Sequence, residues 1–371
     1  MTAPADEATS WPSVLTGLIA GADLDPAAAG WAMEEILSGQ ATSAQIAAFV
    51  VALRAKGETP AEVDALAGVM LRHGRLLDFG PAGRPVCLDV VGTGGDQAHL
   101  VNISTMSALV CAASGAPVVK HGNRAASSAT GTADVLERLG VVIDLEPEQV
   151  VASLRHAGIG FCFAQVHHPA MRHAGPTRRE LGVPTVFNIL GPLTNPGGAD
   201  AALIGSASLE LAPVMADVLH RRGVRAIVVR GEDGLDEIST EAPTRVWDAS
   251  GGPAVESVID AADLGIDRAE RELLRGGDST RNADLLVSTL TSGAPTGADA
   301  DRVSAIRDAV AVNSAAALVA YRAALAAGEP DRRPVLERIA EELPTAREAI
   351  ESGRALAVLH AWVEVTRSLR R

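Results

Sequence analysis

The chain has 371 residues, of which 47% are hydrophobic, so it has enough apolar material for two domains or for one large domain with an appendage. Its formal net charge of −14 argues against nucleic-acid binding, because an acidic surface repels phosphate backbones. The aromatic content of only 3% favours helices packed on a sheet over a β-sandwich, which usually contains more aromatic residues.

The three cysteines and the N-terminal residues indicate the cellular setting. Cys87, Cys111 and Cys162 lie far apart and form no Cys-x-x-Cys pair, so the sequence predicts neither a zinc site nor a disulfide framework. The N-terminal stretch MTAPADEATS contains acidic but no basic residues, and no run of eighteen apolar residues occurs in the chain. These features predict no signal peptide, no membrane span and a cytoplasmic location.

The first part of the chain, from about Trp11 to Gly80, is predicted to be helical throughout. Asp25-Pro26 places an N-cap before a proline in the first turn, and Thr59-Pro60-Ala61-Glu62 is a capping box of the same kind. The helix that begins there is expected to run to about His73. We therefore predict a small helical domain over residues 12–80.

The pattern changes after residues 80–83, where short apolar strands begin to alternate with helices. The stretch Val86–Val91 predicts a strand that is apolar except for Asp89, followed by a helix over Ser104–Ser114 and a second strand around Val118. This alternation is typical of a parallel sheet. The later segments predicted in the same way are strands at Gly160–Ala164, Ala201–Ile204 and Ala226–Arg230, and helices at Leu209–Arg222 and Ala355–Arg370.

These elements together predict an α/β protein with a small helical domain and a larger domain around a mostly parallel sheet. The larger domain is assigned to residues 85–172 and 201–371. The proline-containing segment 173–200 interrupts the α/β pattern and is expected to pack back onto the helical domain. Residues 250–300 are rich in loops and yield no firm assignment.

A glycine-rich loop, Gly92-Thr93-Gly94-Gly95-Asp96, directly follows the first predicted strand. Its three glycines allow a sharp turn that brings backbone N–H groups close to an anion. The loop is not a dinucleotide fingerprint, because Gln97 stands where that motif has glycine, and the chain has no Gly-Lys dipeptide for a Walker A loop. By itself the loop is equally consistent with an ordinary tight turn.

The motif Asn102-Ile103-Ser104-Thr105 is expected to begin the next helix. Helix N-termini attract anions through free N–H groups and the helix dipole, although Ser and Thr there are more often simple caps. Because this motif follows the glycine loop closely, the two together predict one phosphate-binding cradle.

A dense group of hydrogen-bond donors, Lys120-His121-Gly122-Asn123-Arg124, follows the second strand, with Ser127 and Ser128 shortly after it. Ligands of open α/β sheets bind at this end of the strands. Lys120 is one of only two lysines in the chain, so its position at the end of a strand favours a role in binding over simple exposure to solvent. The group predicts an anionic ligand, and a polar surface loop is the less favoured alternative.

Two adjacent carboxylates, Asp236 and Glu237, lie in a glycine-containing turn after the strand that ends near Arg230. Oxygen ligands in such a turn suit Mg²⁺, which keeps several of its waters. A solvated acidic turn would give the same pattern, and it would be the favoured interpretation without the other motifs.

Taken together, these motifs resemble those of the anthranilate phosphoribosyltransferase family, in the expected order from about residue 12 to residue 365. The resemblance depends most on two long and specific motifs, KHGNR at 120–124 and FNILGPLTNP at 187–196. The other matching segments are GTGGD at 92–96, NIST at 102–105, AASS at 125–128, GTAD at 131–134, HHPAM at 167–171, RELG at 179–182, Asp236-Glu237 and GGD at 276–278.

The resemblance implies a fold of the nucleoside phosphorylase-like transferases, a homodimer, and transfer of a 5-phosphoribosyl group from phosphoribosyl pyrophosphate (PRPP) to the amino group of anthranilate in tryptophan biosynthesis. No residue is expected to act as a covalent nucleophile. The implied PRPP-binding residues are Gly92, Gly95, Asp96, Asn102, Ser104, Thr105, Lys120, Ser127 and Ser128. The implied anthranilate-binding residues are Gly92, His121, Asn123, His168, Met171, Arg178 and Pro192, with Arg178 near the carboxylate.

The resemblance also implies two Mg²⁺ ions, held by Ser104, Asp236 and Glu237. The family usually has a phosphate-binding threonine two residues before the asparagine of NIST, and here that position is Leu100. A leucine side chain donates no hydrogen bond, so we expect the loop to hold phosphate through backbone N–H groups. The neighbouring His99 is a hypothetical substitute for the missing hydroxyl.

Three other classes of protein remain as alternatives. A nucleoside phosphorylase on the same fold should lack FNILGPLTNP and the Asp-Glu pair. A nucleic-acid-binding relative would need a basic groove, which a net charge of −14 disfavours. A structural α/β protein without a site would have to match all the motifs by chance.

Overall fold

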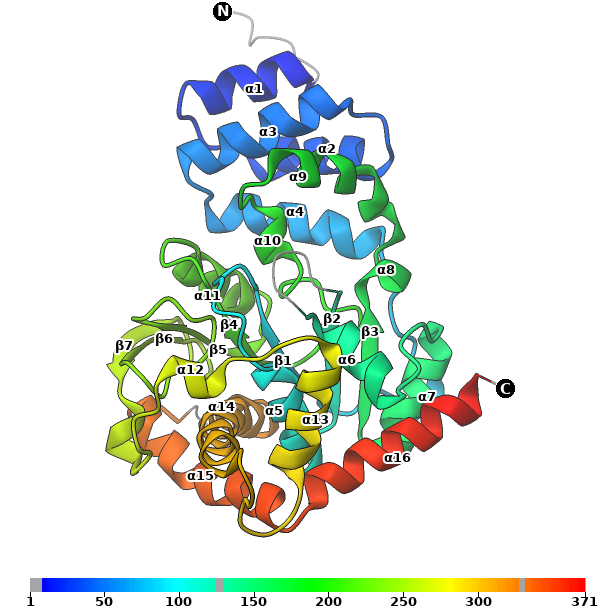
Figure 1. Cartoon of the computed structure of the whole chain (residues 1–371). Coiled ribbons are helices and arrows are strands. Elements are labelled where there is room, and N and C mark those ends of the chain that lie inside the picture. The colour runs from blue at the N-terminus through cyan, green and yellow to red at the C-terminus, as the bar shows by residue number, and fades with distance from the viewer. Residues whose placement is uncertain (1–8, 125–129, 327–330, 371) are drawn as a thin grey trace, which may run out of the picture.

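The computed structural model describes residues 9–124, 130–326 and 331–370, which form a helical unit above a larger α/β unit (Figure 1). The helical unit begins with four helices, each capped by a Ser, Asp or Thr side chain at its N-terminus. These helices are α1 (Trp11–Ile19), α2 (Pro26–Leu37), α3 (Ser43–Lys56) and α4 (Pro60–Arg72).

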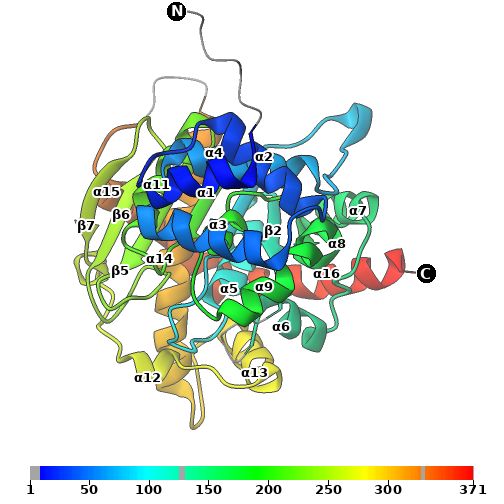
Figure 2. The same ribbon diagram turned by 90° about the horizontal axis from the view of Figure 1, so that it is seen from above.

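A later segment of the chain packs against these helices. It contains α8 (Ala164–His167), a 3₁₀ helix at Pro169–His173, α9 (Gly175–Leu181) and α10 (Phe187–Leu190). Helix α9 packs against α3, and α10 packs against α4, so segments more than 100 residues apart in sequence lie side by side (Figures 1 and 2).

A seven-stranded sheet with the order β3-β2-β1-β4-β5-β6-β7 forms the centre of the larger unit. The first five strands in this order are parallel, and β6 and β7 are antiparallel to their neighbours. The strands are β1 (Leu88–Gly92), β2 (Val118–Gly122), β3 (Ile159–Phe163), β4 (Ala201–Gly205), β5 (Arg225–Gly231), β6 (Thr244–Asp248) and β7 (Val255–Ile259).

Helices cover both faces of this sheet. Helix α5 (Ile103–Ala113) and helix α14 (Ala300–Leu325) pack on one face, while α7 (Pro147–Ala157) and α11 (Leu211–Arg221) pack on the other. The remaining elements of this unit are 3₁₀ helices at Gly80–Ala82 and Ala261–Leu264, α6 (Thr132–Leu139), α12 (Arg271–Leu274), α13 (Ser279–Leu290), α15 (Val335–Glu351) and α16 (Arg354–Leu369).

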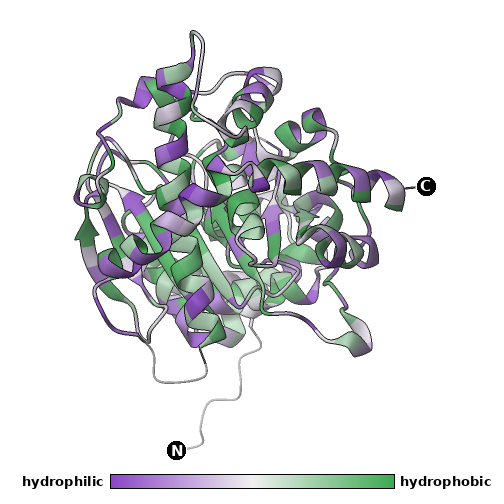
Figure 3. Cartoon of the chain, turned by 90° about the horizontal axis from the view of Figure 1, so that it is seen from below, coloured by the Kyte–Doolittle hydropathy of each residue, from purple (hydrophilic) through white to green (hydrophobic). Residues whose placement is uncertain are grey.

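Alternate side chains of the strands feed two hydrophobic cores. Leu203 and Ile227 belong to the core shared with α5 and α13–α16, whereas Ile204 and Val228 belong to a core shared with α11 and the helical unit. Central strands are accordingly hydrophobic, and the surrounding helices alternate between hydrophobic and hydrophilic residues (Figure 3). The helical unit is therefore attached to the sheet through a continuous apolar core.

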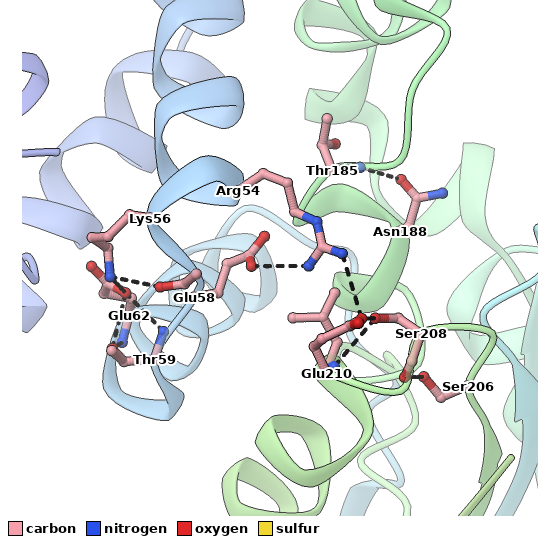
Figure 4. A network of polar contacts seen from close by, with 12 residues as sticks. Arg54, Lys56, Glu58, Thr59, Glu62, Thr185, Asn188, Ser206, Ser208 and Glu210 are labelled. Carbon is pink, nitrogen blue, oxygen red and sulfur yellow. Dashed lines mark hydrogen bonds and ion pairs between the residues drawn. The ribbon is translucent and has the colours of Figure 1, made fainter. Parts of the chain in front are cut away.

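Ion pairs add to this attachment. Arg222 at the end of α11 donates to Asp64 of α4 at 2.6 Å and to the Leu193 carbonyl at 2.9 Å. Arg54 of α3 lies between Glu58 of its own unit, at 3.4 Å, and Glu210 of the α/β unit, at 3.8 Å (Figure 4).

Helix α14 is the one helix of the described ranges that is long and apolar enough to span a membrane. However, 83% of its most apolar window is buried inside the molecule. It contacts β4, β5, α5 and α15, so it is the central helix of the main core.

Most predicted elements lie within one or two residues of the observed ones, but two strands were missed. The hairpin β6–β7 lies in a region that includes part of the segment 250–300, which the sequence analysis left unassigned. Strand β7 lies at the edge of the sheet and exposes Val255 and Val258, so its pattern lacks the apolar run of a central strand. The first predicted strand also starts two residues later than expected, at Leu88.

Candidate active site

The predicted motifs come together at the carboxyl ends of β1, β2 and β5. The chain runs from β1 to β2 on one side of the sheet and from β4 to β5 on the other, so β1 and β4 flank the point where the strand order reverses. Open α/β sheets bind ligands at such a point. The glycine loop that follows β1 lies directly at this position.

Two glycines allow the Asp236 loop to approach the strand ends. A Cβ atom on Gly92 would lie 2.2 Å from the Asp236 carboxylate, and one on Gly205 would lie 1.5 Å from the Asp236 carbonyl oxygen. Any larger residue at either position would displace this loop. Gly92 is expected from its glycine-rich motif, whereas Gly205 stands in no motif of the sequence.

The glycine loop binds a carboxylate of the protein itself. The Gly94 N–H donates to Asp236 Oδ2 at 2.7 Å, and Gly94 and Gly95 have φ values of 67° and 87°. This N–H group therefore orients Asp236, whereas the expected PRPP contacts of Gly92, Gly95 and Asp96 stay a prediction. Gly95 and its neighbour Asp96 remain at the edge of the loop, where Gly95 is exposed.

Asp96, Asp236 and Glu237 form an acidic cluster around this loop. Burial and the nearby Asp96 raise the pKa of Asp236 to about 7. Burial, with the Asp236 charge, also raises the pKa of Glu237 well above its usual value, although Lys120 and the Ser104 N–H oppose the shift. Only Glu237 of these three carboxylates is offset by a nearby lysine, Lys120, so the repulsion among them favours a cation.

The residues present fit a magnesium site. Within the described ranges, no three His, Cys, Asp or Glu side chains enclose a metal by themselves. Mg²⁺ does not require such an enclosure, because it keeps waters and combines one or two carboxylates with substrate phosphates. The half-buried carboxylates of Asp236 and Glu237, whose raised pKa values a bound cation would oppose, meet this requirement.

Lys120 lies beneath the site, with only 1% of its surface exposed. Its Nζ donates to the Val90 carbonyl at 2.6 Å and to Ser104 Oγ at 3.4 Å. Burial lowers its pKa, while the charges of Asp89 and Glu237 raise it. The amine therefore joins β2 to the start of α5 and partly balances the acidic cluster.

Asp89 is a site residue whose role the sequence analysis did not anticipate. It accepts hydrogen bonds from the His121 N–H at 3.3 Å and from Asn195 Nδ2 at 2.7 Å. Asn195 also donates to the Val119 carbonyl at 2.6 Å. Asp89 and Asn195 consequently connect the first two strands to the end of the segment 173–200. The only sequence signal was a single acid in an apolar strand.

The start of α5 contributes residues of the predicted cradle. Asn102 and Ser104 are half-buried, whereas Thr105 is fully buried and its hydroxyl lies 3.3 Å from the hydroxyl of Thr132. Thr105 therefore supports the cradle from below. Its expected contact with PRPP would have to come through the backbone.

The predicted acceptor side contains two neutral histidines. The ring centres of His121 and His168 lie 5.2 Å apart. His121 Nδ1 donates to the Gly191 carbonyl at 2.9 Å, and His168 Nε2 donates to the Thr194 carbonyl at 2.9 Å. Burial lowers the pKa of His121 to about 3 and that of His168 to about 4. Both rings therefore remain uncharged at neutral pH and offer apolar faces rather than a general base.

The other predicted acceptor residues differ in exposure. Met171 is half-buried, Pro192 is buried and Asn123 is exposed. Arg178 on α9 is half-buried, with its guanidinium 5.3 Å from the centre of the Phe187 ring, and it pairs with no carboxylate of the described residues. Burial lowers its pKa. Ser127 and Ser128 lie outside the described residues.

The unusual loop at 97–100 is held in place by backbone contacts with residues 275 and 276. Leu100 bridges to Arg275 and packs on the main core. His99 has a φ of 53°, its carbonyl accepts from the Gly276 N–H at 2.8 Å, and its buried Nδ1 has no partner among the described residues. The hypothesis that His99 substitutes for the family's threonine thus stays a prediction.

Family models match both units of the chain. A helical bundle domain of a glycosyl transferase family matches residues 12–74, and an a/b domain of a glycosyl transferase family matches residues 84–356. Together with the acidic cluster and the lysine at the switch point, these matches define the class of the protein: it is a glycosyl transferase with a helical bundle and an α/β domain.

Individual relatives narrow this class. An anthranilate phosphoribosyltransferase of Salinispora arenicola is 53% identical over 97% of this chain and 98% of its own length, and one of an Arthrobacter species is 50% identical over 96% of each. The solved structure of the Thermus thermophilus enzyme is 39% identical, with a TM-score of 0.82 over 95% of this chain and 99% of its own. The chain belongs to the anthranilate phosphoribosyltransferase family.

A solved yeast enzyme of this family, in complex with PRPP and Mg, also matches with a TM-score of 0.82. It is 27% identical and covers 98% of this chain and 99% of its own. Another yeast structure contains 4-fluoroanthranilate.

Proposed function

We propose that this chain transfers the 5-phosphoribosyl group of PRPP to the amino group of anthranilate, giving N-(5-phosphoribosyl)anthranilate and pyrophosphate, in the biosynthesis of tryptophan. The observation that carries this proposal is the acidic cluster of Asp236 and Glu237 beside Lys120, at the switch point of the sheet. Such a cluster suits a metal-bound diphosphate, and the named relatives supply the identity of the two substrates.

The donor PRPP would lie between the glycine loop, the start of α5 and the acidic cluster. Gly92, Gly95, Asp96, Asn102, Ser104, Thr105, Lys120, Ser127 and Ser128 are the proposed PRPP residues. Asp236 and Glu237, with Ser104, would hold two Mg²⁺ ions. When bound, Mg²⁺ would stabilise the negative charge of the departing pyrophosphate.

The acceptor anthranilate would lie on the side of the helical unit. Arg178 is a half-buried cation without a carboxylate partner among the described residues, so it suits the carboxylate of anthranilate. His121 and His168, both uncharged, would offer ring faces to the aromatic ring. Gly92, Asn123, Met171 and Pro192 complete the proposed acceptor residues.

The chemistry explains why positioning suffices. The aromatic amine of anthranilate is a weak nucleophile, so the main requirement is to stabilise the leaving pyrophosphate and the positive charge that develops on the ribosyl ring. Lys120 and oriented N–H groups would stabilise the negative charge of the leaving pyrophosphate without reorganising, which is usually the largest catalytic contribution. No covalent nucleophile is needed, and alignment of amine and anomeric carbon supplies the remainder.

Closure of the helical unit over the α/β unit would exclude water, which otherwise hydrolyses the activated sugar. The proposed domains are residues 12–80 with 173–200, and residues 85–172 with 201–371. The connections near residues 80–86 and 173–200 are the proposed hinges. Arg54, which lies between Glu58 and Glu210, would adjust as the units move (Figure 4).

A homodimer in the cytoplasm is the form proposed for the active protein, following the family. No nucleic acid or membrane is proposed as a partner, in keeping with the net charge of −14.

Product analysis tests the proposed reaction. The purified protein, incubated with PRPP, anthranilate and Mg²⁺, should release one pyrophosphate for each N-(5-phosphoribosyl)anthranilate detected by mass spectrometry. Pyrophosphate release that does not depend on anthranilate would indicate hydrolysis of PRPP instead. Phosphate-dependent cleavage of a pyrimidine nucleoside would indicate a nucleoside phosphorylase.

A further inference from the structure

Four residues from three segments form a closed ring of hydrogen bonds next to the start of α5. Asn282 Nδ2 donates to Asn102 Oδ1 at 3.0 Å, and Asn102 Nδ2 donates to the Thr130 carbonyl at 3.4 Å. Thr130 Oγ1 donates to the Gly277 carbonyl at 2.8 Å, and the Gly277 N–H returns to Asn282 Oδ1 at 2.7 Å. We call this the Asn282 ring.

Asn282 is the most deeply buried side chain of the ring. It lies in the first turn of α13, its surface is only 3% exposed, and both ends of its amide are used. The segment before α13 approaches it closely, since a Cβ atom on Gly276 would lie 2.6 Å from Asn282 Oδ1. A buried amide with this geometry has little freedom to rotate, because rotation would leave its polar groups unpaired.

The ring determines how Asn102 is oriented. Asn102 occupies the N-cap position of α5, yet its side chain makes no capping bond to that helix. Its carbonyl oxygen and its amide nitrogen are instead directed to Asn282 and Thr130. The side chain at the mouth of the proposed cradle therefore takes its direction from α13.

The same segment supports the loop before α5. The Val101 N–H donates to the Leu274 carbonyl at 2.9 Å, and the Gly276 N–H donates to the His99 carbonyl at 2.8 Å. Residues 274–277 thus lie along residues 99–101 and are fixed at one end by Asn282. Loss of the Asn282 amide would loosen both the loop and Asn102.

We propose that Asn282 is a positioning residue for the binding of PRPP, acting through Asn102 and the loop 97–101. The inference rests on the proposed function, because it takes Asn102 to be part of the PRPP cradle. Asn282 itself does not touch the substrate. Its effect should therefore appear in the affinity for PRPP and not in the affinity for anthranilate.

Two variants at position 282 differ in which hydrogen bonds of the ring they remove. Asn282→Ala removes both bonds, whereas Asn282→Asp still accepts from the Gly277 N–H but cannot donate to Asn102 while ionised. Leu286→Ala is the matched control, because Leu286 is 1% exposed on the same helix and is not part of the ring. We expect it to destabilise α13 without changing the orientation of Asn102.

The measurements are the Michaelis constants of the two substrates and the thermal midpoint of the full-length protein. Asn282→Ala and Asn282→Asp should each raise the constant for PRPP about tenfold, as expected for the loss of one oriented hydrogen bond, and leave that for anthranilate within about twofold. Leu286→Ala should lower the midpoint and leave the ratio of the two constants unchanged. If Asn282→Ala does not fold, Asn282→Asp supports the same comparison.

A double-mutant cycle tests the route through Asn102. Once Asn102→Ala is present, adding Asn282→Ala should weaken PRPP binding much less than it does in the native protein. The dissociation constant is measured by calorimetry with PRPP and Mg²⁺. Equal ratios of the Michaelis constants in Asn282→Ala and Leu286→Ala would overturn the inference, as would full additivity in the cycle. A native protein that binds no PRPP at all would instead overturn the proposed function.

Discussion

At the scale of single residues, the charge of the site determines what it can bind. Asp236 and Glu237 are half-buried, and desolvation raises the pKa of each, so their charged forms are costly without a cation. Lys120 offsets part of this charge and is itself shared with Asp89. The arrangement is therefore unfavourable when empty and becomes favourable when a divalent ion binds.

Replacing Asp236 and Glu237 together by alanine tests this conclusion. Turnover should fall about 100-fold or more, because the charge on the leaving group loses its stabilisation. The remaining activity should depend only weakly on Mg²⁺ concentration in a steady-state assay. Glu232→Ala is the control, since Glu232 is an exposed acid in the same turn that pairs with Arg245. Near-normal turnover in the double variant would contradict the assignment of these residues to the metal.

Arg178 offers a second test at this scale. Arg178→Ala should raise the Michaelis constant for anthranilate about 10- to 100-fold, because a charged hydrogen-bond donor is lost, and should change that for PRPP far less. Arg179→Ala is the matched control, because Arg179 is the exposed neighbour on the same helix. Equal effects of Arg178→Ala on both substrates would remove Arg178 from the acceptor site.

His168 links the site to the pH dependence of stability. Its pKa is about 4 in the folded chain and 6.5 when unperturbed, so the unfolded chain gains a proton as the pH falls below 6.5 while the folded chain does not. This histidine therefore contributes stability that is complete above pH 6.5 and is lost between about pH 6.5 and pH 4. His168→Gln should reduce the drop in urea midpoint between pH 7 and pH 5. An unchanged drop would mean that His168 does not resist protonation.

The sequence identified the residues that occur in motifs. It did not identify the residues elsewhere in the chain whose side chains hold those motifs in position. Gly92, Lys120 and Asp236 stand in dense polar or glycine-rich stretches, and the structure brings these stretches together. Asn195 falls within the FNILGPLTNP motif but was given no role, and Asn282 and Asn313 are single polar residues within largely apolar or mixed segments. Asn313 accepts from the Ile238 N–H at 2.9 Å, next to Glu237. Such contacts over long sequence distances have no local signature.

At the scale of helices and strands, the capping signals were the most informative part of the sequence. Thr59 and Glu62 form the predicted capping box, and Glu62 also accepts from Lys56 Nζ at 2.9 Å (Figure 4). A further hydrogen bond reaches Glu62 from the Leu24 N–H at 2.8 Å. The sequence predicted the cap but not this second role. The buried Glu62 connects three parts of the helical unit.

Glu62→Ala should therefore destabilise the chain more than an ordinary cap substitution does. We expect a loss of about 2–4 kcal/mol in the free energy of unfolding, since buried hydrogen-bond donors lose their partner. Gln45→Ala removes the corresponding residue of the exposed capping box on α3 and should cost about 1 kcal/mol or less. Urea unfolding measures both. Equal losses would show that the buried bonds add nothing to the cap.

The strands were predicted where burial makes them continuously apolar. The central strands β1, β4 and β5 are such segments apart from Asp89 in β1 and the arginines near the ends of β5, and all three were found to within two residues. The edge hairpin was missed because its second strand is largely exposed, so neither an apolar run nor a clean alternation marks it.

At the scale of the whole molecule, the two units are joined by a shared core and by a few ion pairs. The core that contains Ile204 and Val228 extends from the sheet through α11 into the helical unit. Arg222 and Arg54 add polar contacts across the same boundary. The proposed substrates meet beside this boundary, donor on the sheet side and acceptor on the helical side, so small movements of one unit would bring them together.

The central claim is that this site joins anthranilate to PRPP with the help of Mg²⁺. The most direct measurement follows the fluorescence of anthranilate in a mixture of purified protein, anthranilate, PRPP and Mg²⁺, with and without a chelator. We expect loss of fluorescence only when all three small components are present, and no loss once the chelator is added. Two results would contradict the proposed reaction: unchanged fluorescence at saturating substrate concentrations, or a loss of fluorescence that continues after the chelator is added.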